Sequence, residues 1–366
     1  MLRGRRPDMI LLGAILALLG IGVVMVYSSS AVKGYIQFDD PYHFLKAEII
    51  WVALGLTAML LSFRLDVQFL RRWAKPALYL AIVLLLLVKV PGIGRKVNGA
   101  DRWIGLGPLS VQPSEVIKLA MVLVMAHIMA LKPQQIQFFR QGLLPVLALL
   151  GLVAGLIMLQ PDLGTTLAIA GTTFFMLIAA GARVGHLVAL GGSGLALVVA
   201  AIAAAPYRMR RIFAFLDPWA DPSGKGYQTI QALLALGPGR LFGLGLGQSR
   251  QKFLYLPENH TDFIFAMIGE ELGFIGATLV VLLFFLVAWR GFRTAMSAPD
   301  VFSGLLAVGI TSLVSIQAMI NMGVVSGVLP VTGITLPFLS YGGTSLVFTM
   351  LAVGMLLNIS AQVRRG

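Results

Sequence analysis

Long apolar stretches recur along nearly the whole 366-residue chain, and they constrain its fold more than any other feature of the sequence. Hydrophobic residues make up 58% of the sequence and charged residues only 12%, whereas soluble domains carry roughly 25% charged residues. A water-soluble fold of this size cannot hide so much apolar surface from solvent. The chain is therefore expected to be an integral membrane protein.

The membrane spans are expected to be helices. A hydrocarbon core of about 30 Å needs roughly 20 apolar residues per helical crossing, so the chain can cross about ten times with short connections. The alternating pattern of a membrane β-barrel is absent. The sequence therefore predicts an all-α fold with one polytopic membrane domain over residues 1–366. The candidate spans are 9–27, 47–63, 76–90, 116–131, 142–159, 164–181, 187–205, 263–289, 301–322 and 344–360.

Basic residues orient these spans, because Lys and Arg concentrate in short cytoplasmic loops. If the N-terminus is cytoplasmic, fourteen of the 28 basic residues fall in short cytoplasmic segments. An even number of spans then places the C-terminus in the cytoplasm too. The fourteen are Arg3, Arg5, Arg6, Arg64, Arg71, Arg72, Lys75, Lys132, Arg140, Arg183, Arg290, Arg293, Arg364 and Arg365.

The longest polar stretch, residues 206–262, follows the seventh span and is predicted to be extracytoplasmic, like the segment 92–115. It holds seven basic residues where the orientation rule predicts few. A solvated loop is one interpretation, and a loop that meets an anionic partner is the other. Pro, Gly, Trp and Phe among the charges favour a folded loop at the membrane interface. The seven are Arg208, Arg210, Arg211, Lys225, Arg240, Arg250 and Lys252.

Ionisable residues inside a span are costly and by default face the interior of the helix bundle. Glu115 and Lys118 lie three residues apart on one face of the fourth span, which fits a local ion pair or a functional site. Glu270 and Glu271 lie inside the eighth span. An internal salt bridge or helix packing is the simpler explanation for them.

Two aspartates stand where predicted spans begin. Asp262 directly precedes the eighth span, and capping of that helix is its simplest role. Asp162 occupies the tight connection between the fifth and sixth spans, where a turn and a cap are expected.

Several other chemistries are excluded or disfavoured. The sequence has no cysteine, which excludes disulfides, thiolate metal sites and cysteine nucleophiles. The four histidines lack metal-ligand spacing, and the missing Asp-x-Asp pair counts against a metal-bound nucleotide-sugar site. The glycine-rich segment 243–247 lacks the context of a phosphate-binding loop, so flexible or closely packed backbone is expected there.

Four long motifs resemble those of the SEDS family (shape, elongation, division and sporulation) and occur in the family's order. The similarity covers nearly the whole chain, and residues 247–252 with the compact C-terminus resemble the FtsW and SpoVE branch more than RodA. The motifs are Gly-Leu-Gly at 105–107 with QPSEVIKL at 112–119, QPDLGT at 160–165, HTDFIF at 260–265 with EELG at 270–273, and PVTGITLPFLSYGG at 330–343.

The resemblance implies ten transmembrane helices with both termini cytoplasmic, in the bacterial plasma membrane. It implies a peptidoglycan glycosyltransferase that polymerises lipid II on the outer face of that membrane, with Asp262 catalytic and Arg102, Glu115 and Lys118 functionally sensitive. It also implies a class B penicillin-binding protein and divisome or elongasome-type proteins as partners, and no nucleic acid. The sequence leaves open whether the chain serves division, elongation or sporulation.

Such chemistry suits the residues present. The 4-hydroxyl of an acceptor sugar attacks the anomeric carbon of a lipid-linked donor with inversion and expels undecaprenyl pyrophosphate. A carboxylate such as Asp262 can accept the hydroxyl proton. Positive charge for the pyrophosphate is expected from side chains, with a divalent cation such as Mg²⁺ or Mn²⁺ as an optional addition. The candidate cations are Arg102, Lys118, Arg208, Arg210 and Lys252.

Two other classes of function compete with this one. A lipid II flippase needs a polar path through the whole bilayer, commonly built from inverted repeats and broken helices. No such repeat is found, and the charges cluster at the outer ends of spans. A non-catalytic scaffold for a transpeptidase is the third possibility, but it does not explain the buried charges.

Overall fold

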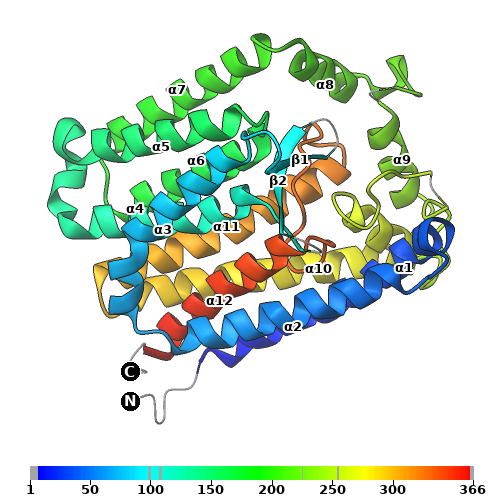
Figure 1. Ribbon diagram of the computed structural model, residues 1–366, viewed down its shortest axis with the longest axis horizontal. Helices are drawn as coiled ribbons and strands as arrows, with labels where there is room; N and C mark the ends of the chain where they lie inside the picture. Colours follow the sequence, from blue (N-terminus) through cyan, green and yellow to red (C-terminus); the bar gives the residue numbers. More distant parts are fainter. Residues whose placement is uncertain (1–6, 98–99, 107–108, 225, 254, 363–366) are drawn as a thin grey trace.

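The computed structural model describes residues 7–97, 100–106, 109–224, 226–253 and 255–362. Its long helices run side by side as a bundle, with the N- and C-terminal regions at the same end (Figure 1). We call this end the terminal end. The opposite end, to which Asp162 and Asp262 belong, is called the distal end.

Ten long helices form the described bundle, and each overlaps one predicted span. Length and apolar composition qualify eight of them to cross a membrane. The two others are α6 (Leu163–Ala179), which is apolar but shorter, and α3 (Val67–Leu87), whose first turns carry Arg71, Arg72 and Lys75. The predicted all-α membrane fold is confirmed. The eight are α1 (Met9–Phe38), α2 (His43–Arg64), α4 (Pro113–Leu131), α5 (Leu144–Met158) with the π-helical turn Phe139–Leu143 before it, α7 (Val184–Ala203), α10 (Ile264–Met296), α11 (Val301–Val325) and α12 (Thr344–Gln362).

Helices α11 and α7 mark the interior and the edge of the bundle. Helix α11 is buried along most of its length and packs against α4, α6 and α10. Helix α7 has no buried residue and lies at the margin of the bundle (Figure 1). Because α7 is apolar apart from His186 and Ser193, most of its exposed side chains suit contact with lipid rather than water.

A small antiparallel sheet lies between α3 and α4, where the sequence analysis predicted only an outer segment. Its strands are β1 (Gly94–Val97), β2 (Ala100–Leu106) and β3 (Leu109–Val111), in that order. In the register of β1 and β2, Lys96 lies opposite Asp101 and Arg95 lies opposite Trp103. Arg102 has no opposite residue and is the extra residue of a β-bulge. Bulges re-aim side chains, and this one sits next to the candidate site described below.

The loop 206–262 is folded, as predicted. It contains α8 (Pro206–Leu216), the short 3₁₀ turn Pro218–Ala220 and α9 (Tyr227–Leu236). Lys225, one of its predicted basic residues, lies outside the described residues, as do Arg3, Arg5, Arg6, Arg364 and Arg365.

Helix α10 is interrupted at Gly273, whose φ of 68° and ψ of −165° are not helical. A positive φ is adopted at low cost only by glycine. The loop segment 240–245 lies against the break and replaces the missing helical hydrogen bonds with its own backbone. The bonds are Leu244 N to Glu270 O (2.9 Å), Gly245 N to Glu271 O (3.0 Å), Phe274 N to Arg240 O (2.8 Å) and Ile275 N to Leu241 O (3.1 Å).

Gly243 of the glycine-rich segment 243–247 is closely packed at this break, whereas Gly245 and Gly247 are exposed, so the expected close packing is confirmed only where the segment begins. A Cβ on Gly243 would lie 2.1 Å from the Glu271 carbonyl oxygen, so no larger residue fits there. The Glu271 carboxylate accepts a hydrogen bond from Ser28 Oγ of α1, and the Glu270 carboxylate accepts one from Ser249 Oγ of the loop. Neither glutamate forms an ion pair within the described residues, and each instead ties α10 to another segment by hydrogen bonds.

Residues 326–343 connect α11 to α12 without a helix and enter the bundle. Phe338 is buried and stacks on Phe284 of α10, and its carbonyl oxygen lies where a Cβ on Gly22 would be. Irregular backbone at membrane depth is tolerated only where protein buries it or where it lines a cavity. We call this segment the inserted loop.

Candidate active site

Asp262 stands just before α10, beside the inserted loop. The N-cap position of α10 belongs to Phe263, and no side chain caps the helix there. Phe263 N donates to the Glu258 carbonyl instead. The expected capping role of Asp262 is therefore wrong, and its carboxylate accepts no hydrogen bond from the described residues.

Asp262 is partly exposed, and its surroundings favour the protonated carboxyl. Burial is the largest cause that raises its pKa, to about 7 from an ordinary value of 3.8, and the charges of Glu258 and Asp162 act in the same direction. The guanidinium groups of Arg102 and Arg211 oppose them. A carboxylate with a pKa near neutrality, flanked by cations, is suited to accept a proton from a hydroxyl group.

Arg102 and Asp162 form one wall of the site. The Arg102 guanidinium donates to the carbonyl oxygens of Gln160 (3.0 Å) and Pro161 (2.6 Å), which fixes the connection between α5 and α6. Asp162 accepts from Thr165 N (3.0 Å) and Thr165 Oγ1 (2.9 Å). The predicted cap at the start of α6 is confirmed.

Arg211, one of the seven basic residues of the loop but not among the predicted candidate cations, is the loop cation that reaches the site. It lies on α8, donates to the Val331 carbonyl of the inserted loop (3.3 Å), and acts electrostatically on Asp262. The only feature of the sequence that pointed to Arg211 was its place among the seven basic residues of the loop 206–262.

The predicted loop cations Arg208, Arg210 and Lys252 are not brought to Asp262 by any described contact. Arg208 donates to Tyr207 Oη and to the Ala201 carbonyl, both within α7 and α8. Lys252 donates to the Gly247 carbonyl of its own segment, and Arg210 is exposed on α8.

Lys118 and Glu115 form the predicted ion pair, with 2.8 Å between Nζ and a carboxylate oxygen, and both are buried. Lys118 Nζ also donates to Gln317 Oε1 of α11 (2.6 Å). One helical turn further, Asn321 Nδ2 donates to the Asp262 carbonyl oxygen (2.7 Å). Residues four apart share a helix face, separated by about 6 Å of rise. Helix α11 thus holds the Lys118 pair and Asp262 on adjacent turns.

Gly333 of the inserted loop faces the Asp262 carboxylate. Its φ is +79°, and a Cβ built there would lie 3.5 Å from Asp262 Oδ2. Glycine therefore permits both the backbone conformation and open space beside the carboxylate.

An apolar groove of about 690 Å³ runs between α5, α6 and α7 and approaches the site. Its lining includes Gly151, Leu167 and Leu197. At the distal end it reaches Leu163 and Thr166, and Thr166 Oγ1 donates to the Asp162 carbonyl oxygen. The groove therefore connects a lipid-facing surface to the wall of the site.

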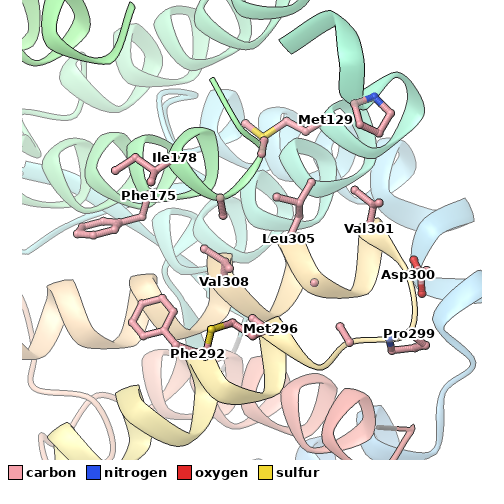
Figure 2. Close-up of a pocket in the computed structure, with 16 residues that line it drawn as sticks. Met129, Phe175, Ile178, Phe292, Met296, Pro299, Asp300, Val301, Leu305 and Val308 are labelled. Carbon is pink, nitrogen blue, oxygen red and sulfur yellow. The ribbon is translucent and has the colours of Figure 1, made fainter. Parts of the chain in front are cut away.

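A second pocket, of about 810 Å³, lies at the terminal end of the bundle and is lined mainly by apolar side chains such as Phe292 and Leu305 (Figure 2). Its single charged lining residue is Asp300, whose carboxylate accepts from Ser303 N and caps α11. This pocket holds no free catalytic group.

Comparisons with known proteins agree with this architecture. The family model of the cell cycle proteins FtsW, RodA and SpoVE matches residues 9–365. Stage V sporulation protein E of Bacillus subtilis (strain 168) is 50% identical over 98% of both chains. The probable peptidoglycan glycosyltransferase FtsW of Trichlorobacter lovleyi is 46% identical over 98% of this chain and 94% of its own.

Two solved structures share the fold. A chain of a peptidoglycan synthase complex, solved in a study of how polymerization and crosslinking are coordinated, superimposes with a TM-score of 0.79 at 31% identity, covering 98% of this chain and 99% of that chain. The rod shape determining protein RodA of Thermus thermophilus gives a TM-score of 0.70 at 29% identity, covering 98% of each chain.

Proposed function

This chain belongs to the FtsW, RodA and SpoVE family of cell cycle proteins, and from that premise we propose that it is a peptidoglycan glycosyltransferase that polymerises lipid II. The observation that carries the proposal is the Asp262 carboxylate. It accepts no hydrogen bond from the described residues, has a pKa near neutrality, and lies within electrostatic reach of Arg102 and Arg211.

The proposed reaction is an inverting displacement at the anomeric carbon of the donor. Asp262 accepts the proton of the acceptor 4-hydroxyl while that oxygen forms the new glycosidic bond. The bond from the anomeric carbon to the pyrophosphate oxygen breaks, and the electron pair leaves with undecaprenyl pyrophosphate. Arg102, Arg211 and Lys118 supply the positive charge that stabilises the leaving group.

The groove between α5, α6 and α7 is evidence that the substrate is lipid-linked. A polyprenyl chain needs an apolar path that is open to the bilayer, and the groove provides one that reaches Leu163 and Thr166, next to the α5–α6 connection that Arg102 binds. The lipid tail and the pyrophosphate would then occupy continuous apolar and cationic surfaces.

The described residues form no metal site made of protein ligands alone here. Both Asp162 carboxylate oxygens are used by Thr165, and no cluster of three His, Asp or Glu suited to a metal occurs in the described part of the chain. The proposed reaction therefore includes no step through Mg²⁺ or Mn²⁺.

The proposal extends to partner and place. A relative in a complex that coordinates polymerization with crosslinking supports a crosslinking partner, which we take to be a class B penicillin-binding protein, together with divisome or elongasome-type proteins. The location is the bacterial plasma membrane, with both termini cytoplasmic and the distal end extracytoplasmic.

The orientation can be tested by cysteine labelling, because the chain has no native cysteine. Ser223 in the loop 206–262 and Ser297 at the end of α10 are both exposed. In intact cells or spheroplasts, a membrane-impermeant thiol reagent should label Ser223→Cys and not Ser297→Cys, which should react only after the membrane is opened. Equal labelling of both from outside would contradict the orientation.

The geometry favours polymerisation over a flippase. A flippase of known design opens a path at broken helices, and α10 is broken at Gly273. That break is filled by the backbone of residues 240–245, so it does not open a path across the bundle.

Purified protein and lipid II test the function directly. Glycan strands should form in detergent or vesicles, and addition of the cognate transpeptidase should raise the rate. Transfer of lipid II between leaflets without any glycan, under conditions where the transpeptidase complex is intact, would contradict the proposal.

Gly333→Ala should lower the rate of polymerisation about tenfold or more. The substitution puts a methyl group beside the Asp262 carboxylate and adds about 1–2 kcal/mol of backbone strain. The matched control is Gly327→Ala in the same loop, where φ is +72° but the nearest contact is the Leu233 side chain at 3.5 Å. Equal rates for the two variants would show that Gly333 matters only for loop conformation.

A further inference from the structure

The backbone just before α10 is fastened at three consecutive carbonyl oxygens. All three donors come from α11 or from the inserted loop, so the position of Asp262 depends on these two elements rather than on α10. The bonds are Tyr341 N to His260 O (2.9 Å), Ser340 Oγ to Thr261 O (2.6 Å) and Asn321 Nδ2 to Asp262 O (2.7 Å).

Asn321 differs from the other two donors because it bonds two segments at once. Its Nδ2 donates to the carbonyl oxygens of Asp262 and Ile334, both at 2.7 Å, which uses both hydrogens of the amide. The residue is 1% exposed, and its Oδ1 has no hydrogen-bond partner among the described residues. A buried amide in a membrane helix is costly unless such bonds compensate.

The two carbonyls that Asn321 joins belong to opposite sides of the site. One is that of Asp262 itself. The other belongs to Ile334, the neighbour of Gly333, which faces the Asp262 carboxylate. One nitrogen atom thereby fixes the separation between the base and the backbone opposite it.

We propose that Asn321 is a positioning residue for glycosyl transfer, which holds the Asp262 carboxylate at a fixed distance from Gly333 and on the same face of α11 as Lys118. The inference rests on the proposed function. Reacting geometry tolerates little displacement, and an error of 1 Å can cost about 100-fold in rate. Asn321 does not touch substrate, so its loss should slow the chemical step without weakening lipid II binding.

Asn358 of α12 provides a matched control at the terminal end. It is 2% exposed, and its Nδ2 also donates to two backbone carbonyls, those of Phe63 (2.5 Å) and Leu65 (2.6 Å). Leucine has nearly the same shape as asparagine but no amide. Asn321→Leu and Asn358→Leu therefore each leave two backbone carbonyls without their side-chain donor. Asn358→Leu also removes the acceptor of Gln362 Nε2, so it should lose at least as much thermal stability as Asn321→Leu.

Only Asn321→Leu should change the chemistry. We expect its kcat with lipid II to fall about 10- to 100-fold while KM stays within about twofold. Its pH profile should also shift in the acid limb, because the hydration of Asp262 changes when the loop relaxes. Asn358→Leu should keep both the kcat and the pH profile of the unmodified protein.

Asn321→Asp keeps the shape of the side chain and serves if the leucine variant fails to insert. Aspartate has at most one O–H to donate, whereas the asparagine amide donates to both carbonyls, so a loss of kcat in the same direction is expected. Equal kcat values and acid limbs for the Asn321 and Asn358 variants would overturn the inference. Because Asp262→Asn is assayed in parallel, an active Asp262→Asn would instead overturn the base assignment on which the inference rests.

Discussion

Asp262→Asn is expected to make almost no glycan from lipid II while remaining folded and inserted. Asparagine cannot act as a carboxylate base, and a positioned base is worth a factor of about 100 to 10,000 in rate. Little structure is lost, because the Asp262 carboxylate caps no helix and the Asn321 bond goes to its backbone. The measurement is the rate of polymerisation by purified protein, with folding checked by the thermal unfolding midpoint.

The control for this substitution is Asp300→Asn, which changes an aspartate that does cap a helix, α11, at the terminal end. Asparagine caps helices about as well as aspartate, so this variant should keep its activity and most of its stability. If Asp262→Asn polymerises within a few-fold of the unmodified protein, Asp262 is not the base, and only the family membership survives.

The same assignment sets the direction of the pH dependence. Burial raises the pKa of Asp262 to about 7, and only the ionised carboxylate can accept the hydroxyl proton. One pH unit below that pKa roughly a tenth of the groups are ionised, so kcat/KM should fall about tenfold per unit on the acid side. Asp262→Asn should lose this limb, and a limb that persists in the variant would belong to another group.

Hydropathy predicted the helices well because bilayer thickness acts on each span separately. All ten predicted spans overlap a helix, and the differences lie at the ends, as where α1 continues to Phe38. The break at Gly273 was not predictable. The apolar pattern continues through it, and its cause is hydrogen bonding with residues 240–245, which are distant in sequence.

The difference between local patterns and contacts distant in sequence also separates the site residues that were predicted correctly from those that were missed. The Asp162 cap and the Glu115–Lys118 pair each join residues three apart, so spacing alone revealed them. The role of Asp262 depended on where Phe263 N finds its acceptor, which spacing does not reveal. The rule that selected Glu115 concerns ionisable residues and so passes over Asn321, although an uncharged polar residue inside a predicted span is the only signal the sequence offers for it.

Arg102 and Arg211 show a third case. The resemblance marked Arg102, but its orientation comes from a β-bulge that exists only once β1 and β2 pair. Arg211 was one of seven basic residues in its loop, and only the fold separates it from Arg208, whose guanidinium binds Tyr207 and the Ala201 carbonyl instead of the inserted loop. Tertiary pairing, rather than composition, selects the cations that meet Asp262.

Lys118 presents the harder test, because Lys118→Ala should abolish activity under two different explanations. The ion pair with Glu115 is buried, and removal of one partner from a buried pair costs about 3–5 kcal/mol. A dead Lys118→Ala variant therefore does not distinguish a catalytic cation from a group that only neutralises Glu115. Lys118→Arg does not separate them either, because a tight site can reject the larger planar group in both cases.

The double variant Glu115→Gln with Lys118→Met separates the two explanations. It removes both charges together, and replacement of a whole buried pair by neutral groups of similar volume is often neutral or stabilising. Gln317 Oε1, which accepts from Lys118 in the native protein, loses that donor, and the new glutamine at 115 brings an amide donor to the same pair of helices. We therefore expect near-native thermal stability.

If Lys118 stabilises the departing pyrophosphate, the double variant should still polymerise lipid II about 100- to 1,000-fold more slowly, since that is the usual effect of removing one preorganised stabilising group. A stable double variant with near-native turnover would limit Lys118 to pairing Glu115, and would leave Arg102 and Arg211 as the cations of the reaction.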